Sequence, residues 1–368
     1  MSRILTAPAG LLAALALFLG LAPALQAQSS DDPWALRFRR LTDSIHLAYR
    51  PEPLRFIVEG NVTIIINEAD VVVVDGSGAP AAARQVIAYI REQTPHPVRF
   101  LINTHGHGDH TLGNEAYVQA FSGIEIIARP ETRGYMTGNG IDYVRQIAAS
   151  TASRKQSGAD EIARLQREGA PGHEVVIALL RQYYEHDLDL RQQAYRTLHL
   201  TPPTMTFESR LVLHRANRAI DIRYLGPGDT RGDAVVYLPN DRIVITGDMV
   251  VHPIPYGFSR HPLAWIQTLD ALAALDFDLL IPGHGDVQEG KAYLDQVRAL
   301  LRDVQAQIRR GLDRGLDLDG IRQQVDLRQR LDQFVQNDPV LRYFFRAYFS
   351  DPHIERAYNA ITSRRSDR

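Results

Sequence analysis

The chain has 368 residues, of which 45% are hydrophobic and 23% are charged, a globular composition that excludes a wholly disordered, collagen-like or coiled-coil protein. The formal net charge is −2, from 41 basic and 43 acidic residues, so there is no basic surplus with which to hold nucleic acid. The chain has no cysteine, which excludes disulfides, thiol nucleophiles and cysteine-containing zinc sites; a metal would have to be held by histidine nitrogen and carboxylate oxygen.

The N-terminus has the layout of a secretory signal peptide over residues 1–27. Arg3 is followed by an apolar run over 11–22 and then by small residues at Ala24 and Ala27, either of which could precede the cleavage point. The run is shorter than a membrane-spanning helix needs. We therefore expect a periplasmic or secreted protein with no stable membrane span after signal cleavage; the alternative is an uncleaved N-terminal anchor.

Short β-branched runs, separated by glycine and polar residues, predict consecutive strands at 56–58, 62–66 and 71–74. Apolar residues then recur at helical spacing over 81–93, and a further apolar run predicts a strand over 98–103. The first part of the chain is therefore predicted to be rich in strands, with one helix between them.

A helical insert is predicted over 131–204, because β-branched runs become rare there and apolar residues recur among arginines and glutamines. From residue 288 on, apolar residues at spacings of three and four predict an amphipathic helix, with more helix to about residue 348. This pattern predicts a core domain over 40–290 and a helical C-terminal extension over 291–368. Between the insert and the extension, strands are expected again at 210–214, 219–225, 234–238, 242–245 and 279–282.

The candidate chemistry is concentrated directly after the predicted strand at 98–103. His105 and His107 are two residues apart, so in extended backbone they point the same way, and Asp109 and His110 follow on the turn into the next helix. Glycines between them let the backbone fold tightly enough for four side chains to converge. Because neutral imidazole and carboxylate suit zinc, one pair could hold one cation and the other pair a neighbouring one.

The pattern His-X-His-X-Asp-His after a strand resembles the signature of the metallo-β-lactamase superfamily. The resemblance implies an α/β fold, the four-layer αββα sandwich, with the metals at one edge between two sheets. It also implies two zinc ions per chain as the cofactor. Four further segments resemble the other motifs of the family in the right order, namely 71–76 with Asp75, 225–233 with Asp229, 245–248 with Asp248 and 281–285 with His284.

The resemblance implies a role for each of these residues. Asp75 would support the site from behind the metal ligands, and we expect Asp109 and Asp248 to matter most directly for catalysis. The implied ligands are His105 and His107 for the first metal, Asp109, His110 and His284 for the second, and Asp248 between the two.

One position departs from the family pattern, because most hydrolases of the superfamily have a third histidine for the first metal where this chain has Asp229. Asp229 could replace the imidazole as a carboxylate ligand, and the first site would then tolerate manganese or iron as well as zinc. Alternatively, the first site is weak and one metal is held by Asp109, His110 and His284. In the third interpretation Asp229 is a turn residue and another group, such as His252, completes the site.

These observations predict an exported metal-dependent hydrolase in which a metal-bound hydroxide attacks the carbonyl of an ester, lactone, lactam or amide in a small molecule. The alternatives are a β-lactamase proper and a non-catalytic metal-binding protein on the same fold. His252, Tyr256 and His261 are candidates for the rim of the substrate cleft, because loops at such rims carry specificity. The insert over 131–204 is expected to cap this cleft as a helical lid.

Overall fold

The first of two β-sheets has seven strands in the order in which they occur along the chain. The strand pairs up to β3–β4 are antiparallel, and the pairs from β4–β5 onward are parallel. The strands are β1 (Arg37–Arg40), β2 (Ile45–Tyr49), β3 (Val62–Ile66), β4 (Val71–Val74), β5 (Val98–Ile102), β6 (Glu125–Ala128) and β7 (Met205–Thr206). These strands belong to a computed structural model that describes residues 32–50, 59–149 and 151–366.

The chain divides into residues 1–32 and a compact unit over 33–368. The predicted signal peptide and the predicted strand at 56–58 lie outside the described residues. No helix of the described residues is both long enough and apolar enough to cross a membrane.

The second sheet has six strands in the order β13-β12-β11-β10-β9-β8. Only β11 and β12 run parallel, and helix α9 (Pro262–Ala273) provides the crossover between them. The strands are β8 (Arg210–His214), β9 (Ala219–Arg223), β10 (Val235–Leu238), β11 (Ile243–Ile245), β12 (Leu279–Ile281) and β13 (Gln288–Glu289).

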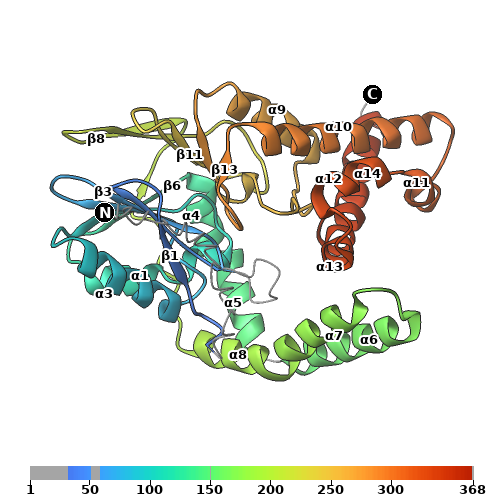
Figure 1. The fold of residues 1–368 in the computed structure, drawn as a ribbon, viewed down its shortest axis with the longest axis horizontal. Coiled ribbons are helices and arrows are strands. Elements are labelled where there is room, and N and C mark those ends of the chain that lie inside the picture. The colour runs from blue at the N-terminus through green and yellow to red at the C-terminus, as the bar shows by residue number, and fades with distance from the viewer. Residues whose placement is uncertain (1–31, 51–58, 150, 367–368) are drawn as a thin grey trace, which may run out of the picture. The chain divides into compact units, whose positions relative to one another are not determined.

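Alternating side chains give the two sheets a shared core and separate outer cores. On β4, Val72 and Val74 face the second sheet, whereas Val71 and Val73 face helices α1 (Pro80–Gln93) and α3 (Asn114–Ala120). The outer face of the second sheet packs in the same way against α9 and α10 (Ala292–Asp313). Both α1 and α9 begin with proline in the first turn, where its missing N–H is not needed. The layers are therefore helix, sheet, sheet and helix, which confirms the predicted αββα sandwich (Figure 1).

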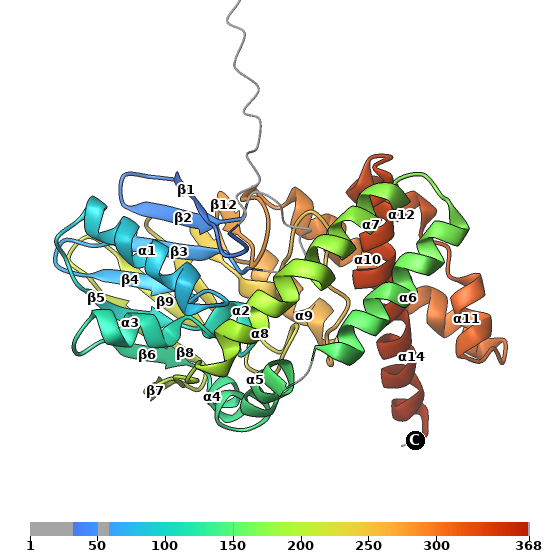
Figure 2. The same cartoon turned by 90° about the horizontal axis from the view of Figure 1, so that it is seen from below.

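Helices occupy the region that was predicted as an insert. The segment from α6 to η1 contains a hairpin and ends in a π-helix, and the hairpin packs against the C-terminal extension through Leu165, Val176 and Leu180 (Figure 2). The helices are α4 (Pro130–Thr137), α5 (Asn139–Ala149), α6 (Ala152–Glu168), α7 (His173–Arg181), the π-helix η1 (Gln182–Asp187) and α8 (Leu188–Arg196).

The C-terminal extension is helical, as predicted, and it also contains a π-helix. Its long first helix, α10, buries Val297, Leu301, Val304 and Ile308 against the second sheet and α9. After α10 come α11 (Leu318–Gln324), α12 (Arg328–Val335), α13 (Pro339–Phe344), the π-helix η3 (Phe345–Ser350) and α14 (Asp351–Ser366).

Candidate metal centre

The candidate ligands come from loops at one edge of both sheets. His105 and His107 lie between β5 and the short helix α2 (Gly108–Thr111), which carries Asp109 and His110. Asp229 lies in the loop between β9 and β10, and Asp248 lies in the 3-10 helix η2 (Gly247–Met249) directly after β11. His284 follows β12. Because parallel strands end at the same edge, residues far apart in sequence meet there.

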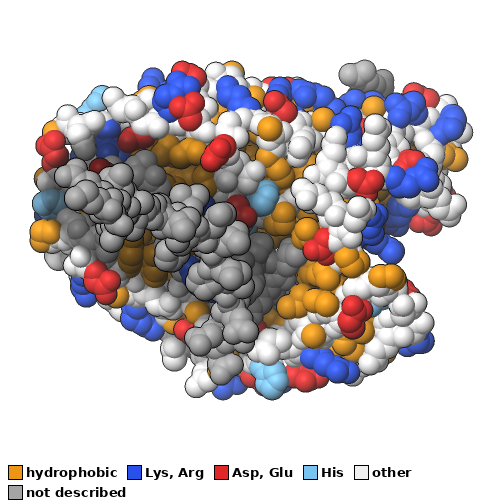
Figure 3. Space-filling view, viewed as in Figure 1, with side chains coloured by type: hydrophobic (Ala, Val, Ile, Leu, Met, Phe, Trp, Pro, Cys, Tyr) orange, Lys and Arg blue, Asp and Glu red, His pale blue; other side chains and the backbone are white. Residues whose placement is uncertain are grey.

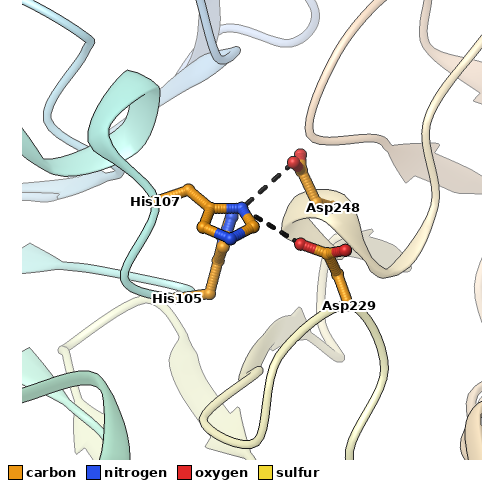
Figure 4. A group of neighbouring side chains, drawn as sticks. All are labelled: His105, His107, Asp229 and Asp248. Atoms are coloured by element: carbon orange, nitrogen blue, oxygen red, sulfur yellow. Dashed lines mark ion pairs between the residues drawn. The ribbon is translucent and has the colours of Figure 1, made fainter. Parts of the chain in front are cut away.

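The first group consists of His105, His107, Asp229 and Asp248, whose ligand atoms all lie within 4.8 Å of one another. The Nδ1 atom of His107 is 3.0 Å from Oδ2 of Asp229, and Nε2 of His105 is 3.6 Å from Oδ2 of Asp248. Figure 4 shows the two imidazoles facing the two carboxylates across this group. Asp229 thus belongs to the first group, and His252 belongs to neither of the two groups found among the described residues.

The second group consists of Asp109, His110, Asp248 and His284. The Oδ1 atom of Asp248 is 3.2 Å from Nε2 of His110 and 3.2 Å from Nε2 of His284. The Oδ2 atom of Asp109 is also 3.2 Å from Nε2 of His284. Asp248 is the residue that both groups share, with Oδ2 on the side of His105 and Oδ1 on the side of His110 and His284.

Hydrogen bonds from behind hold three of the imidazoles in place. Oδ2 of Asp75 is 2.9 Å from Nδ1 of His110, and Oδ1 of the same carboxylate accepts the Thr104 N–H at 2.8 Å. The Thr104 hydroxyl is 3.0 Å from Nδ1 of His105, and the Glu59 carbonyl oxygen is 3.0 Å from Nδ1 of His284. In all three rings Nδ1 has a partner and Nε2 faces the centre, which is the arrangement that orients histidines toward a metal.

The electrostatics of the site favour positive charge at its centre. Burial acts to lower the pKa of His110, but the charges of Asp248 and Asp75 raise it well above the usual value. The pKa of His284 is raised to about 9, because the carboxylates of Asp248 and Asp109 outweigh the effect of burial. Burial acts to raise the pKa of Asp248, yet the surrounding histidines hold it well below its usual range.

The donor set fits divalent cations. If the four histidines are neutral, the surrounding carboxylates leave an uncompensated negative charge in a largely buried place, which is costly unless cations balance it. Nε2 of His105 and Oδ1 of Asp248 are buried and have no hydrogen-bond partner within the described part of the chain. Each group offers two histidine nitrogens and two carboxylate oxygens, and no sulfur. This donor set matches the preferences of zinc and also suits manganese or iron.

Two glycines make room for this geometry. A Cβ atom at Gly283 would lie 2.1 Å from Oδ1 of Asp248, and one at Gly60 would lie 2.5 Å from Cε1 of His110. Both distances are shorter than any real contact, so a side chain at either position would displace a candidate ligand.

The three candidate rim residues lie at different places. The ring of Tyr256 has its centroid 5.5 Å from that of His284, so it lies next to the second group. The ring of His252 packs edge-on against Tyr293 at 5.0 Å, and its backbone N–H donates to the His284 carbonyl oxygen at 3.1 Å. His261 precedes the first turn of α9, and burial together with nearby arginines lowers its pKa.

Sequence reasoning missed three residues that support the site. The Glu59 carbonyl oxygen contacts His284, and the Asn61 side-chain amide donates to the carbonyl oxygens of Pro282 and Gly285 at 2.9 Å each. These contacts join segments more than 200 residues apart and leave no local signal in the sequence. Asp233 accepts the Thr230 N–H at 3.0 Å, and its place in the repeated Gly-Asp of residues 228–233 is a signal that could have found it.

Comparison with known proteins agrees with this architecture. Among curated proteins, the linear primary-alkylsulfatase of Pseudomonas sp. (strain ATCC 19151) is 25% identical over 295 residues, which cover 74% of this chain and 51% of that protein. The 2,4-dinitroanisole O-demethylase subunit alpha of Nocardioides sp. (strain JS1661) is 25% identical over 243 residues, or 63% of this chain and 56% of that protein. The chain therefore spans about half the length of these curated relatives.

The structure of the stereoselective inverting sec-alkylsulfatase Pisa1 from Pseudomonas sp. resembles the chain with a TM-score of 0.62 at 16% identity, covering 88% of this chain and 50% of that one. At this identity the likeness concerns the fold. The model of the metallo-beta-lactamase superfamily matches residues 56–284, which is more than half of the chain and includes every candidate ligand. The chain therefore belongs to the metallo-beta-lactamase superfamily.

Proposed function

We propose that the protein is an exported hydrolase that uses two divalent cations, zinc in the first instance, to cleave an ester bond in a small molecule. The observation that carries the proposal is the sharing of Asp248 by two ligand groups. Each group also contains two histidines and one further aspartate, and its ligand atoms lie within 4.8 Å of one another. Two adjacent cations on a shared carboxylate are a recurrent arrangement for hydrolysis.

The proposed division of labour follows from the atoms that face the centre. His105, His107 and Asp229 would hold one cation, and Asp109, His110 and His284 the other, with Asp248 between them. When bound, such cations supply Lewis acidity toward an ester oxygen and acidify a water molecule.

The chain itself contributes orientation and charge. The carboxylates of Asp109 and Asp248 remain ionised, because the neighbouring histidines hold the pKa of each well below its usual range despite burial. Both can therefore accept hydrogen bonds from a water molecule and orient it. Asp75 and the Glu59 carbonyl oxygen fix the rings of His110 and His284, so the ligand atoms are already in place before substrate arrives.

Two kinds of ester are candidates. The geometry suits a carboxylic ester or lactone, in which the attacked atom is a carbonyl carbon; an amide or lactam would use the same arrangement. The names of two relatives, a linear primary-alkylsulfatase and a sec-alkylsulfatase, support the sulfuric ester of an alkyl alcohol as the second candidate. A carboxylate at position 229, where imidazole is usual, is compatible with either.

Metal quantification and a substrate panel test the proposal together. Purified protein should bind two zinc ions per chain and hydrolyse at least one member of a panel containing p-nitrophenyl esters, a lactone, nitrocefin and an alkyl sulfate. Val118→Ala, which changes an exposed side chain on α3, serves as the control and should leave metal content and turnover unchanged. Binding of less than one metal, with no turnover in added zinc or manganese, would refute the hydrolase proposal and favour a non-catalytic protein. Turnover of nitrocefin alone would instead favour a β-lactamase proper.

Export has its own test. The proposal predicts that the full chain, expressed in a bacterium, is recovered from the periplasm or medium, with an N-terminus that begins at residue 25 or 28. Recovery of the intact chain from the cytoplasm would contradict export, and recovery of the intact chain from the membrane would favour an uncleaved anchor.

A further inference from the structure

Three aromatic side chains form a wall beside the second ligand group. The ring centroid of Tyr256 is 5.5 Å from that of His284, 6.1 Å from that of Phe258 and 5.6 Å from that of Tyr348. Phe258 and Tyr348 are themselves 6.0 Å apart. These distances are those of rings in contact. We call Tyr256, Phe258 and Tyr348 the aromatic wall.

Two backbone segments meet at the aromatic wall. Tyr256 and Phe258 lie in the loop between η2 and α9, and Tyr348 lies in the π-helix η3. The Gly257 N–H donates to the Tyr348 carbonyl oxygen at 2.7 Å. A Cβ atom at Gly257 would lie 2.4 Å from the Phe349 carbonyl oxygen, so only glycine lets the loop approach the π-helix this closely. The loop that carries Tyr256 and Phe258 is therefore held against the π-helix that carries Tyr348.

The aromatic wall is more accessible than the rings behind it. Phe344 and Phe349, in the same stretch of helix, are completely buried, whereas Phe258 is 40% exposed and Tyr256 and Tyr348 are partly exposed. Large exposed apolar side chains are few among the described residues, and Phe258 is the only aromatic one. An exposed phenylalanine that contacts Tyr256, which itself lies next to His284, is the combination expected of a substrate site, which is apolar with a few convergent polar groups.

A second π-helix lies close to the first. Burial raises the pKa of Tyr348, and so does the proximity of Tyr343 and of Tyr183 and Tyr184 from η1. Tyr184 of η1 also packs in one hydrophobic cluster with Tyr343, which lies in α13 directly before η3, so the insert and the extension meet here. Hydrophobic side chains gather on the face of the molecule where α13 approaches α7 (Figure 3). Single π-helical turns inside helices are frequent at functional sites, and η3 supplies Tyr348 to the aromatic wall.

We propose that the aromatic wall binds the apolar alkyl or aryl group attached to the scissile ester bond, and so selects substrates with a long apolar chain. The inference rests on the proposed hydrolase function and specifies its substrate class. The polar end of the substrate would lie at the ligand groups, and its apolar group would extend from His284 across Tyr256 toward Phe258 and Tyr348. The extension, which supplies Tyr348, would thus help to set the length of chain that is accepted.

Binding of a homologous series of carboxylates tests the aromatic wall without requiring turnover. Sodium butyrate, hexanoate and octanoate are titrated calorimetrically into the zinc-loaded full chain. Affinity should rise with each methylene, by up to about fourfold where the methylene is fully buried. In Phe258→Ala and in Tyr348→Ala, the rise in affinity per added methylene should become smaller and approach zero. Tyr348→Phe, which keeps the ring, should retain the wild-type gain.

Val118→Ala is the matched control, because Val118 is 43% exposed and lies on α3, which packs on the first sheet. It should leave the gain per methylene unchanged. Wild-type affinity that does not depend on chain length would overturn the inference, as would an unchanged gain in Phe258→Ala and Tyr348→Ala. Absence of turnover on every ester, together with a chain-length gain that both variants lose, would refute the proposed hydrolysis while supporting the aromatic wall as an apolar binding site.

Discussion

A buried histidine in the C-terminal extension predicts a specific pH dependence of stability. His353 is completely buried, and within the described residues neither of its ring nitrogens has a hydrogen-bond partner. Its ring stacks on Phe349 at 5.1 Å and meets Trp265 edge-on at 6.0 Å. Burial, with a smaller contribution from the charge of Arg356, lowers the pKa of His353 to about 3. The folded protein therefore holds this imidazole neutral throughout the physiological range.

The direction and size of the effect follow from the two pKa values. In the unfolded chain the imidazole has its ordinary pKa of about 6.5. Between about pH 6.5 and pH 3 the unfolded chain binds a proton that the folded protein does not bind, so stability falls as the pH drops through this window. Each unit below pH 6.5 lowers the free energy of unfolding by about 1.4 kcal/mol, which amounts to a loss of about 2 kcal/mol between pH 7.5 and pH 5.

Urea unfolding of metal-free protein at pH 7.5 and pH 5, followed by circular dichroism, measures this loss. In both His353→Phe and His353→Leu the loss should be smaller than in the wild type by about 2 kcal/mol, whatever the absolute stability of each variant. Because each variant is compared with itself at two pH values, overpacking or a cavity at position 353 cancels. His186→Gln, which removes an exposed imidazole, should show the wild-type loss. An identical loss in the wild type and both His353 variants would refute the reasoning.

Three predictions concern the metal centre. Asp229→Ala should lower the zinc content from two toward one per chain, because Oδ2 of Asp229 faces the first group; a variant that still binds two would contradict its role as a ligand. His110→Ala should abolish turnover on the best substrate of the panel, because the second group loses an imidazole, and full activity would contradict the proposed centre. Asp75→Asn should weaken zinc affinity by about 10- to 100-fold in competition with a chromophoric chelator, because it removes the charge behind His110; unchanged affinity would show that this charge is irrelevant.

Much of the fold could be predicted because the signals are local. β3 and β4 have the predicted bounds, and β5, α1 and most strands of the second sheet differ by one or two residues at their ends. Five strands were not predicted, and three of them have weak patterns. β1 reads Arg-Phe-Arg-Arg and is half exposed, and β7 and β13 have two residues each. The pairing partners of these three strands, rather than their own composition, make them strands. β2 and β6 were also not predicted, although both consist mainly of buried residues.

The candidate site likewise has one part that local sequence predicts and another part that depends on long-range pairing. His105, His107, Asp109 and His110 share one short segment, so their proximity could be predicted directly. The partners of that segment could be predicted only through the order of motifs, since β11 and β12 bring Asp248 and His284 to it by long-range pairing.

The position of Asp229 beside His107, the Glu59 carbonyl oxygen behind His284, and the packing of α7 on α13 depend on tertiary contacts. No periodic pattern in the sequence indicates any of these contacts. The two π-helices are likewise absent from the sequence pattern, because a single widened turn changes the helical spacing by only one residue.

The two ligand groups draw on both halves of the sandwich, so cations bound there would have a second role. The segment 105–110 belongs to the first sheet, whereas Asp229, Asp248 and His284 belong to the second. Each bound cation would therefore cross-link two halves that are separated by more than 100 residues of chain. By mass action, a cation present at 100 times its dissociation constant adds about 2.7 kcal/mol to the free energy of unfolding. Folding of the proposed metalloenzyme would then depend on metal supply, and chains that lack metal would unfold more readily.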